Sequence, residues 1–166
     1  MIAISSVLTW GNTKPKMVPR GPDDPETENE EEEEAPLEGD EEAEKPIKYK
    51  RLPFEESDYT LRKAPEKYLR HKSLETLILS TGMNKPNLNV YVVCAGVLYG
   101  KGESILNYHC RSAWLEDPYE LPYIGEGLNM IPTIHISDLG RYVKHVLAVH
   151  PDTHYLFGID ATPDTT

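Results

Sequence analysis

The sequence lacks any cluster of basic residues that could bind nucleic acid. It has 166 residues, with 17 Lys and Arg against 28 Asp and Glu, and its formal net charge is −11. The negative charge is concentrated in residues 23–44, which contain fourteen Asp and Glu and no Lys or Arg. Without that segment the net charge would be +3, and phosphate binding requires clustered Lys and Arg. We therefore expect no nucleic-acid partner.

Long apolar runs and paired cysteines are also missing. No stretch approaches the roughly 18 consecutive apolar residues that a membrane span needs, and the opening MIAISSVLTW has no basic start like that of a signal peptide. Cys94 and Cys110 form neither a CxxC motif nor a disulfide framework. These absences predict a soluble chain in a reducing compartment, the cytoplasm, without a membrane partner.

Neither of the common glycine motifs for nucleotide binding is present. There is no GxGxxG, and the stretch GVLYGKG at 96–102 has three residues between its first two glycines where the phosphate loop GxxxxGK has four. Val97, Leu98 and Tyr99 are also bulky for a loop whose backbone N–H groups surround phosphate. We interpret this stretch as a strand that runs into a glycine turn, and we expect no cofactor.

Metal ligands are not grouped either. His145, His150 and His154 lie around a helix end, and no carboxylate or cysteine completes a ligand set. His135 stands between two isoleucines in a predicted strand, where a half-buried histidine with satisfied hydrogen bonds is the commoner finding. The sequence thus predicts no metal site.

What the sequence does contain is an alternation of strand and helix patterns. The run YVVC within 88–96 is typical of a strand buried on both faces, and further strands are predicted at 2–10, 131–136 and 154–159. Helices are predicted at 66–81, after Ser104 as N-cap, and after Ser137 as N-cap. This order predicts an α/β fold with a mostly parallel sheet flanked by helices.

Apolar spacing predicts which helix faces are buried. In 66–81, the residues Leu74, Leu77, Ile78 and Thr81 share one face, so we expect them to form the core stripe. The clearest amphipathic pattern follows Ser137, where apolar residues recur at i, i+3, i+4, i+7 and i+8: Leu139, Tyr142, Val143, Val146 and Leu147.

Four segments follow from these patterns. Residues 1–12 form a core strand and turn, 13–52 an acidic insertion, 53–160 the main α/β part, and 161–166 a polar tail. The insertion is too rich in Pro, Glu and Asp to bury a core, so we expect it to be disordered. It is either a solvated spacer, which we favour, or an acidic tether for a cationic partner surface.

Three motifs resemble the second half of extended short-chain dehydrogenase/reductases of the epimerase-like branch. They are ISSVLTWG at 4–11, YLRHK at 68–72, and VVCAGVLYGKGE followed by IPTIHISDL. The resemblance implies a Rossmann-like domain of which this chain is the carboxyl-terminal half. It also implies a catalytic set of Ser6, Tyr68 and Lys72.

The chemistry of that set is physically reasonable. Tyr68 and Lys72 are four residues apart on one helix face, where an ammonium would favour the phenolate and lower the pKa of the tyrosine. Ser6 would hold the substrate oxygen. Because the family's cofactor lies on a GxGxxG unit that is absent here, we expect these three residues to be vestigial.

A longer string of motifs resembles the adenylate kinase 7 family, in the region upstream of the kinase domain. It includes FEESDYTLRK at 54–63, HKSLETLIL, YVVCAGVLYG and AWLEDPYELPYIGEGLNMIPTIHISDL at 113–139. The resemblance implies a protein of motile cilia and sperm flagella.

Three functional hypotheses remain open. The first is a non-catalytic structural subunit of the axoneme whose partners are other axonemal proteins. The second is an NAD(P)-dependent epimerase or reductase that uses Ser6, Tyr68 and Lys72. The third is an accessory domain of an adenylate kinase.

Overall fold

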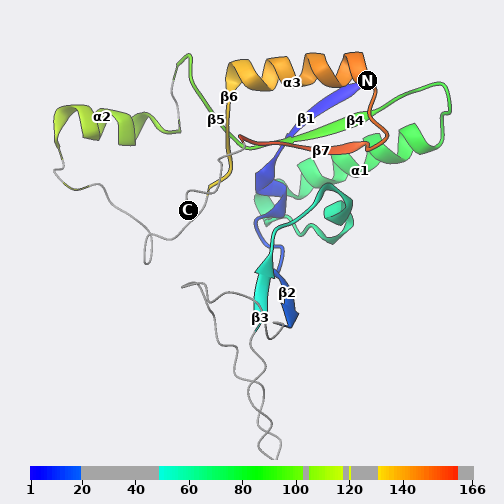
Figure 1. The fold of residues 1–166 in the computed structure, drawn as a ribbon, viewed down its shortest axis with the longest axis horizontal. Helices are drawn as coiled ribbons and strands as arrows, with labels where there is room; N and C mark the ends of the chain where they lie inside the picture. The colour runs from blue at the N-terminus through cyan, green and yellow to red at the C-terminus, as the bar shows by residue number, and fades with distance from the viewer. Residues whose placement is uncertain (20–48, 103–104, 118–119, 121–130, 161–166) are drawn as a thin grey trace, which may run out of the picture. The chain divides into compact units, whose positions relative to one another are not determined.

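The computed structural model describes residues 1–19, 49–102, 105–117, 120 and 131–160 (Figure 1). The chain divides into two compact units, one made of Met1–Thr13 with Glu56–Thr166 and the other of Lys14–Glu55. In the described ranges, no helix is both long and apolar enough to cross a membrane.

The larger unit is built on three parallel strands. They are β1 (Ile2–Ser6), β4 (Tyr91–Ala95) and β7 (Tyr155–Gly158), in the order β1-β4-β7. All five residues of β4 are buried, because β4 has a strand on each side and a helix over each face. The predicted α/β fold with a mostly parallel sheet is confirmed.

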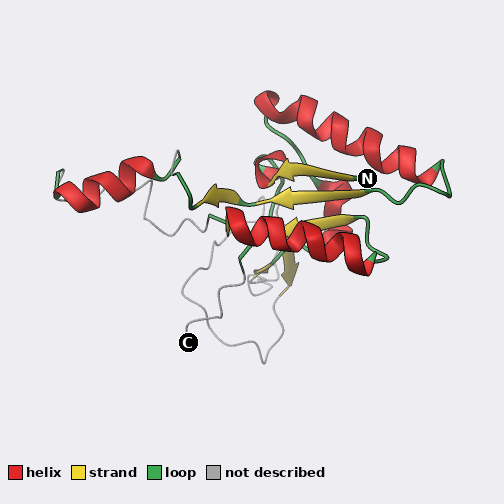
Figure 2. Ribbon diagram, turned by 90° about the horizontal axis from the view of Figure 1, so that it is seen from above, coloured by secondary structure: helices red, strands yellow, loops and turns green. Residues whose placement is uncertain are grey.

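Helices α1 (Leu69–Met83) and α3 (Ile136–Val149) cover opposite faces of this sheet (Figure 2). Side chains alternate along β4, so Val92 and Cys94 pack with Leu79 of α1, while the alternate residues Tyr91, Val93 and Ala95 pack with Leu139 and Val146 of α3. The predicted inward stripe of α3 is thus confirmed apart from Leu147, which is exposed.

The predicted core stripe of α1 is wrong in part. Leu74 and Leu77 are 52% and 60% exposed, whereas Glu75 and Leu79 are buried. Only Ile78 of the predicted apolar stripe packs against the core. The helix is rotated relative to the prediction, since Gly82 allows a close approach to Val90 that any Cβ would prevent.

Several element boundaries differ from the predictions. β1 ends at Ser6, and the 3₁₀ helix η1 (Val7–Trp10) follows it. α1 continues past the predicted end at residue 81 to Met83.

The N-cap of α3 is His135 rather than Ser137, because the imidazole Nδ1 accepts a hydrogen bond from the Ser137 N–H at 3.2 Å. Helix α2 (Asn107–Leu115) begins after Leu106, and the predicted cap Ser104 lies outside the described residues.

The glycine-rich stretch after β4 is a strand and a turn, as predicted. β5 (Val97–Tyr99) pairs in parallel with β6 (Thr133–His135) as a separate two-stranded sheet. Gly96 separates β4 from β5, and a Cβ there would lie 2.8 Å from the Pro132 carbonyl oxygen. Gly100 and Gly102 then have φ of +88° and +112°, which favours glycine.

The smaller unit contains an antiparallel pair, β2 (Lys16–Pro19) and β3 (Tyr49–Leu52). Both strands fall at the ends of the segment 13–52 that we expected to be disordered, so that expectation is wrong for these eight positions. The composition argument did not predict a strand at Tyr49–Leu52, because two of these four residues are Lys and Arg. The acidic residues at 23–44 lie outside the described residues.

The two edges of the three-stranded sheet differ. At β7, the 3₁₀ helix η2 (Glu56–Leu61) lies against the strand, and the Glu56 carboxylate accepts a hydrogen bond from the Phe157 N–H at 3.0 Å. At β1, the side chain of Ile4 is 58% exposed. The β7 edge is therefore capped, whereas β1 is the less protected edge.

Candidate functional site

Ser6 lies where β1 ends and its hydroxyl has a structural role. The Ser6 Oγ accepts a hydrogen bond from the Leu8 N–H at 3.3 Å and so caps η1, while the Ser6 carbonyl accepts from the Thr9 hydroxyl at 2.9 Å. Serine is suited to this position because its short side chain can reach the first free N–H groups of a helix.

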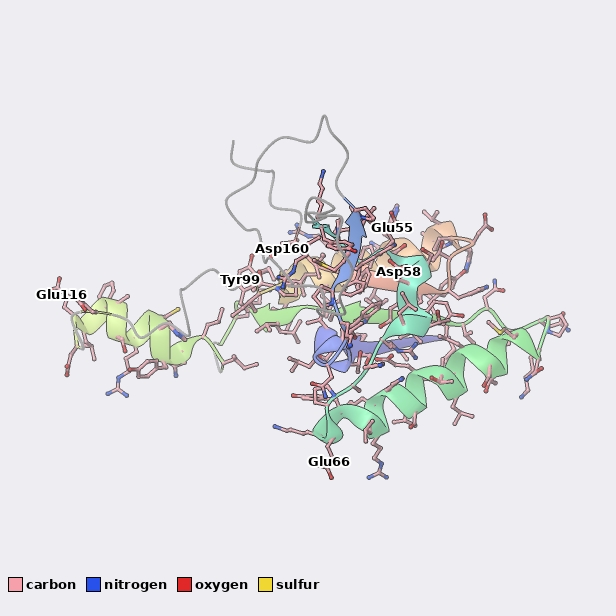
Figure 3. The ribbon with its side chains drawn as sticks, turned by 90° about the horizontal axis from the view of Figure 1, so that it is seen from below. Glu55, Asp58, Glu66, Tyr99, Glu116 and Asp160 are labelled. Atoms are coloured by element: carbon pink, nitrogen blue, oxygen red, sulfur yellow. The ribbon has the colours of Figure 1, made fainter. Side chains whose placement is uncertain are left out.

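Tyr68 and Lys72 lie at the start of α1. Tyr68 closes the short 3₁₀ helix η3 (Glu66–Tyr68) and occupies the N-cap position of α1, with its ring 5.6 Å from that of His71. The ammonium group that lies over the Tyr68 ring is that of Lys67, at 5.8 Å. Figure 3 shows Glu66 beside this helix start, where a carboxylate interacts favourably with the helix dipole.

The three residues of the predicted catalytic set are not joined by any recorded side-chain contact in the described part of the chain. The Ser6 hydroxyl bonds to backbone, and Lys72 contributes its carbonyl to the Thr76 hydroxyl at 3.0 Å. Their catalytic role stays a prediction.

A buried ion pair joins α1 to the segment that precedes it. The Arg62 Nε is 2.8 Å from the Glu75 Oε2, and the two side chains are only 4% and 3% exposed. The Ser5 hydroxyl donates to the other carboxylate oxygen, and Arg62 also donates to the Tyr59 carbonyl and to the Thr76 hydroxyl. Every charged atom of this pair therefore has a partner, which burial of an ion pair requires.

An aromatic layer covers the guanidinium of Arg62. Its Cζ lies 5.6 Å from the centre of the Tyr59 ring and 5.3 Å from that of Tyr155, and these two rings stack at 5.4 Å. Trp10 donates from Nε1 to the Tyr155 hydroxyl at 2.9 Å and packs 5.2 Å from Phe157. Trp10 thus ties η1 to β7.

Two buried groups near this pair, the Cys94 thiol and the Tyr155 phenol, have raised pKa values. Burial raises the pKa of the Cys94 thiol to about 11, and burial followed by the nearby Cys94 raises the pKa of Tyr155. A thiol or phenol with a raised pKa stays protonated near pH 7, and it is then neither a general base nor a nucleophile. The cluster can hold the sheet and α1 together, but neither Cys94 nor Tyr155 is suited to proton transfer near pH 7.

Two histidines, His135 and His154, form hydrogen bonds with the backbone. His135 caps α3 and lies in an edge contact with Tyr99 at 5.2 Å, which confirms that it is a half-buried, satisfied residue. His154 bonds through Nδ1 to the Val90 carbonyl at 2.8 Å. In the described ranges, no group of three or more His, Cys, Asp and Glu side chains could hold a metal ion.

Sequence reasoning missed Arg62 and Glu75 for a definite reason. Two stripes of α1 compete for the core: one is Leu74, Leu77 and Thr81, and the other is Glu75, Leu79 and Gly82. Hydrophobicity alone selects the first. The second is buried because glycine permits the approach to β4 and because Arg62, from outside the helix, neutralises Glu75.

Comparison with known proteins identifies relatives over most of the sequence. The chain is 32% identical over 164 residues to Adenylate kinase 7 of Mus musculus, which covers 99% of the chain and 22% of that protein. It is 36% identical over 91 residues to Adenylate kinase 7 of Macaca fascicularis, which covers 55% of the chain and 17% of that protein. No protein-family model matches the chain. No solved structure matches it either.

The chain spans about a fifth of the length of the curated relatives that it matches. The similarity to the mouse protein nevertheless extends over nearly all of its own residues. The chain is an adenylate kinase 7-like protein.

Proposed function

We propose that the chain is a non-catalytic structural module of the axoneme of motile cilia or flagella, in the cytoskeleton, where it binds other axonemal proteins. The observation that carries the proposal is the outer edge of β1, with which no strand of the described residues pairs. The similarity of the chain to adenylate kinase 7 adds support, since the motif resemblance described above implies a protein of motile cilia and flagella.

The backbone of β1 offers hydrogen bonds on its outer side. The Tyr91 N–H donates to the Met1 carbonyl at 2.9 Å, and pairing in a parallel ladder alternates along the strand. The N–H and C=O groups of Ala3 and Ser5 therefore face β4, whereas those of Ile2 and Ile4 face away from the sheet. These outward groups can pair with one further strand.

The apolar flank of α1 lies on the same side. Along a helix, Leu74 and Thr76 point to opposite sides of Glu75, because successive residues are 100° apart. The Thr76 hydroxyl accepts a hydrogen bond from Arg62, which follows η2 in the chain. Because η2 packs against β7, the Thr76 flank of α1 faces the β7 edge of the sheet. Leu74 and Leu77 are therefore on the β1 flank, and α1 contacts β1 directly.

The chemistry of this surface favours an apolar strand of a partner protein. β1 has the sequence IAISS and no charged residue, so the edge lacks the Lys or Pro that usually protects an exposed strand. A partner strand beside β1 would cover Ile4, and a segment packed after it would cover Leu74 and Leu77. Binding of this kind uses no cofactor.

Axoneme binding tests the proposed interaction. Purified chain is mixed with demembranated axonemes and the bound fraction is measured by sedimentation. We expect saturable binding that Ile4→Lys reduces by about tenfold or more, because a charge on the bare edge opposes strand pairing. Leu147→Lys, on the exposed side of α3, adds the same charge elsewhere and should bind like the unmodified chain. Equal binding of both variants would contradict the role of β1.

Calorimetry tests the absence of catalysis. NADH, NADPH, ATP and AMP are titrated separately into the chain, whose fold is checked by circular dichroism. We expect no saturable heat from any of them. Saturable binding of a nicotinamide cofactor that Lys72→Ala weakens would instead support the epimerase or reductase with Ser6, Tyr68 and Lys72.

An accessory role in an adenylate kinase is the second candidate. It is favoured by the name of the two relatives and by the small share of their length that the chain spans. This role predicts that the chain changes the kcat or KM of a relative's kinase activity when added to it. The purely structural role predicts no change.

A further inference from the structure

A cavity of about 260 Å³ opens in the larger unit at the amino-terminal ends of β4 and β7. Its walls come from η2, from the last turn of α1 and from the residues that lead into β7. Ser6 lies at the other, carboxyl-terminal end of the parallel sheet. The cavity is therefore separate from the predicted catalytic set and from the outer edge of β1.

The walls of the cavity are mostly apolar and have defined shapes. Leu79 and Met83 are one turn apart on α1, and Gly82 between them leaves no side chain in the way. The lining also contains Tyr59 and Tyr155, which pack with Leu79 and whose rings are stacked with an interplanar angle of 19°. A dry cavity of about 150 Å³ can hold benzene, so this space suits a ring with a short chain.

The one acidic group of the described lining is Glu56, beside hydroxyl groups such as those of Ser57 and Thr153 that can donate or accept. Glu56 is the one carboxylate among the described lining residues, and only its Oε1 is used, by the Phe157 N–H. His154 must donate from Nδ1 to the Val90 carbonyl, so the Nε2 of the neutral ring is an acceptor as well. Arg62 contacts both tyrosine rings but is not among the described lining residues, and its charge is already neutralised by Glu75.

We propose that this cavity binds a small amphipathic cation, meaning a ring of phenyl or indole size that carries a protonated amine. The ring packs against the side chains of Tyr59, Leu79 and Met83, which line the cavity. The ammonium pairs with the second carboxylate oxygen of Glu56. An anionic ligand is disfavoured, because Glu56 would repel it and no Lys or Arg is among the described lining residues.

Three probes with one ring system test the charge preference. Tryptamine is a cation, indole is neutral and indole-3-propionate is an anion, and each is titrated into the full chain by ligand-observed NMR at pH 7.5. We expect tryptamine to bind about tenfold or more tightly than indole-3-propionate, with indole between them. Equal affinities, or no binding of tryptamine to the folded chain at millimolar concentration, would overturn the proposal.

Two variants locate the binding. Glu56→Gln keeps an oxygen that can accept from the Phe157 N–H, so we expect indole to bind as before while the preference for tryptamine disappears. Met83→Trp changes an exposed lining residue and should fill the cavity, which abolishes binding of all three probes. If tryptamine binds equally well to both variants, its site is elsewhere. Axoneme binding through β1 does not depend on either result.

Discussion

At the scale of single residues, the stability of the larger unit depends on one buried ion pair. Arg62 and Glu75 connect the segment before α1 with the face of α1 that covers the sheet. Ions inside a protein lose their hydration, and each is tolerated only while its partner remains. The intact pair therefore changes the free energy of unfolding little, whereas the loss of one partner lowers it strongly.

Glu75→Leu should lower the free energy of unfolding by roughly 3 to 5 kcal/mol, because it leaves the Arg62 guanidinium buried without its partner. The double variant Arg62→Met with Glu75→Leu should recover most of that loss. Urea unfolding followed by circular dichroism measures both. Arg141→Met is the control, since it breaks an exposed pair with Asp138 and should cost about 1 kcal/mol or less. Equal effects of Glu75→Leu and Arg141→Met would contradict this account.

Cys94 gives the larger unit a defined response to alkaline pH. Burial raises its pKa from 9.0 to about 11, so below pH 9 the thiol is protonated in both the folded and the unfolded chain. Between pH 9 and 11 only the unfolded chain ionises. Stability should therefore fall by up to roughly 2 to 3 kcal/mol over this range, at 1.36 kcal/mol per pKa unit.

Denaturant unfolding at pH 8, 9, 10 and 11 tests this dependence. Cys94→Ala should flatten the first part of the decline, although the raised pKa of Tyr155 adds a decline of the same sign at higher pH. Cys110→Ser alters an exposed thiol and should leave the profile unchanged. A Cys94→Ala profile that is parallel to that of the unmodified chain would show that Cys94 does not cause the decline.

At the scale of helices and strands, two helical glycines have opposite roles. A Cβ on Gly82 would lie 2.1 Å from the Val90 Cγ2, whereas a Cβ on Gly140 would meet nothing within 4 Å. Intrinsic propensity favours alanine over glycine in both helices by about 1 kcal/mol. Packing therefore determines whether alanine stabilises or destabilises the chain at Gly82, and helix propensity determines this at Gly140.

We expect Gly140→Ala to stabilise the chain by about 0.5 to 1 kcal/mol and Gly82→Ala to destabilise it by about 1 to 3 kcal/mol. Thermal and urea unfolding of the two single variants provide the measurement. Stabilisation by Gly82→Ala would mean that Val90 can move aside and that the approach of α1 to the sheet is not close.

The sequence was sufficient to predict the elements whose patterns have one interpretation. β4 is a continuous apolar run and α3 has one dominant apolar stripe, so both lie where they were predicted. α1 has two candidate stripes, and the choice between them depends on Arg62 and Val90, which lie outside the helix. The site residues Arg62 and Glu75 were not predictable for the same reason, because their burial exists only when both are in place.

At the scale of the whole molecule, the folded core belongs to one unit. Every buried cluster lies within Met1–Thr13 and Glu56–Thr166, and the backbone N–H of Asn12 bonds to the Lys63 carbonyl at 3.0 Å. Residues 14–55 contain none of these core residues. The fold of the larger unit should therefore be retained without them.

Replacing residues 14–55 by a short Gly-Ser linker should change the free energy of unfolding by less than about 1 kcal/mol, since none of the buried residues that the structure describes is removed and loop length has a weak effect on closure entropy. Urea unfolding of the shortened chain measures the change. A matched variant keeps residues 14–55 but replaces the acidic residues at 23–44 by Ser, which separates effects of charge from effects of deletion. Loss of cooperative unfolding in the shortened chain would contradict the division into units.

The alternation of hydrogen bonds along β1 has a consequence for amide exchange with deuterium. The N–H groups of Ala3 and Ser5 face β4 and exchange only when the strand opens, whereas those of Ile2 and Ile4 face outward and exchange quickly in the free chain. A partner strand would slow Ile2 and Ile4. The fast and slow alternation over these few residues therefore records, at single-residue resolution, whether the edge of the sheet is occupied.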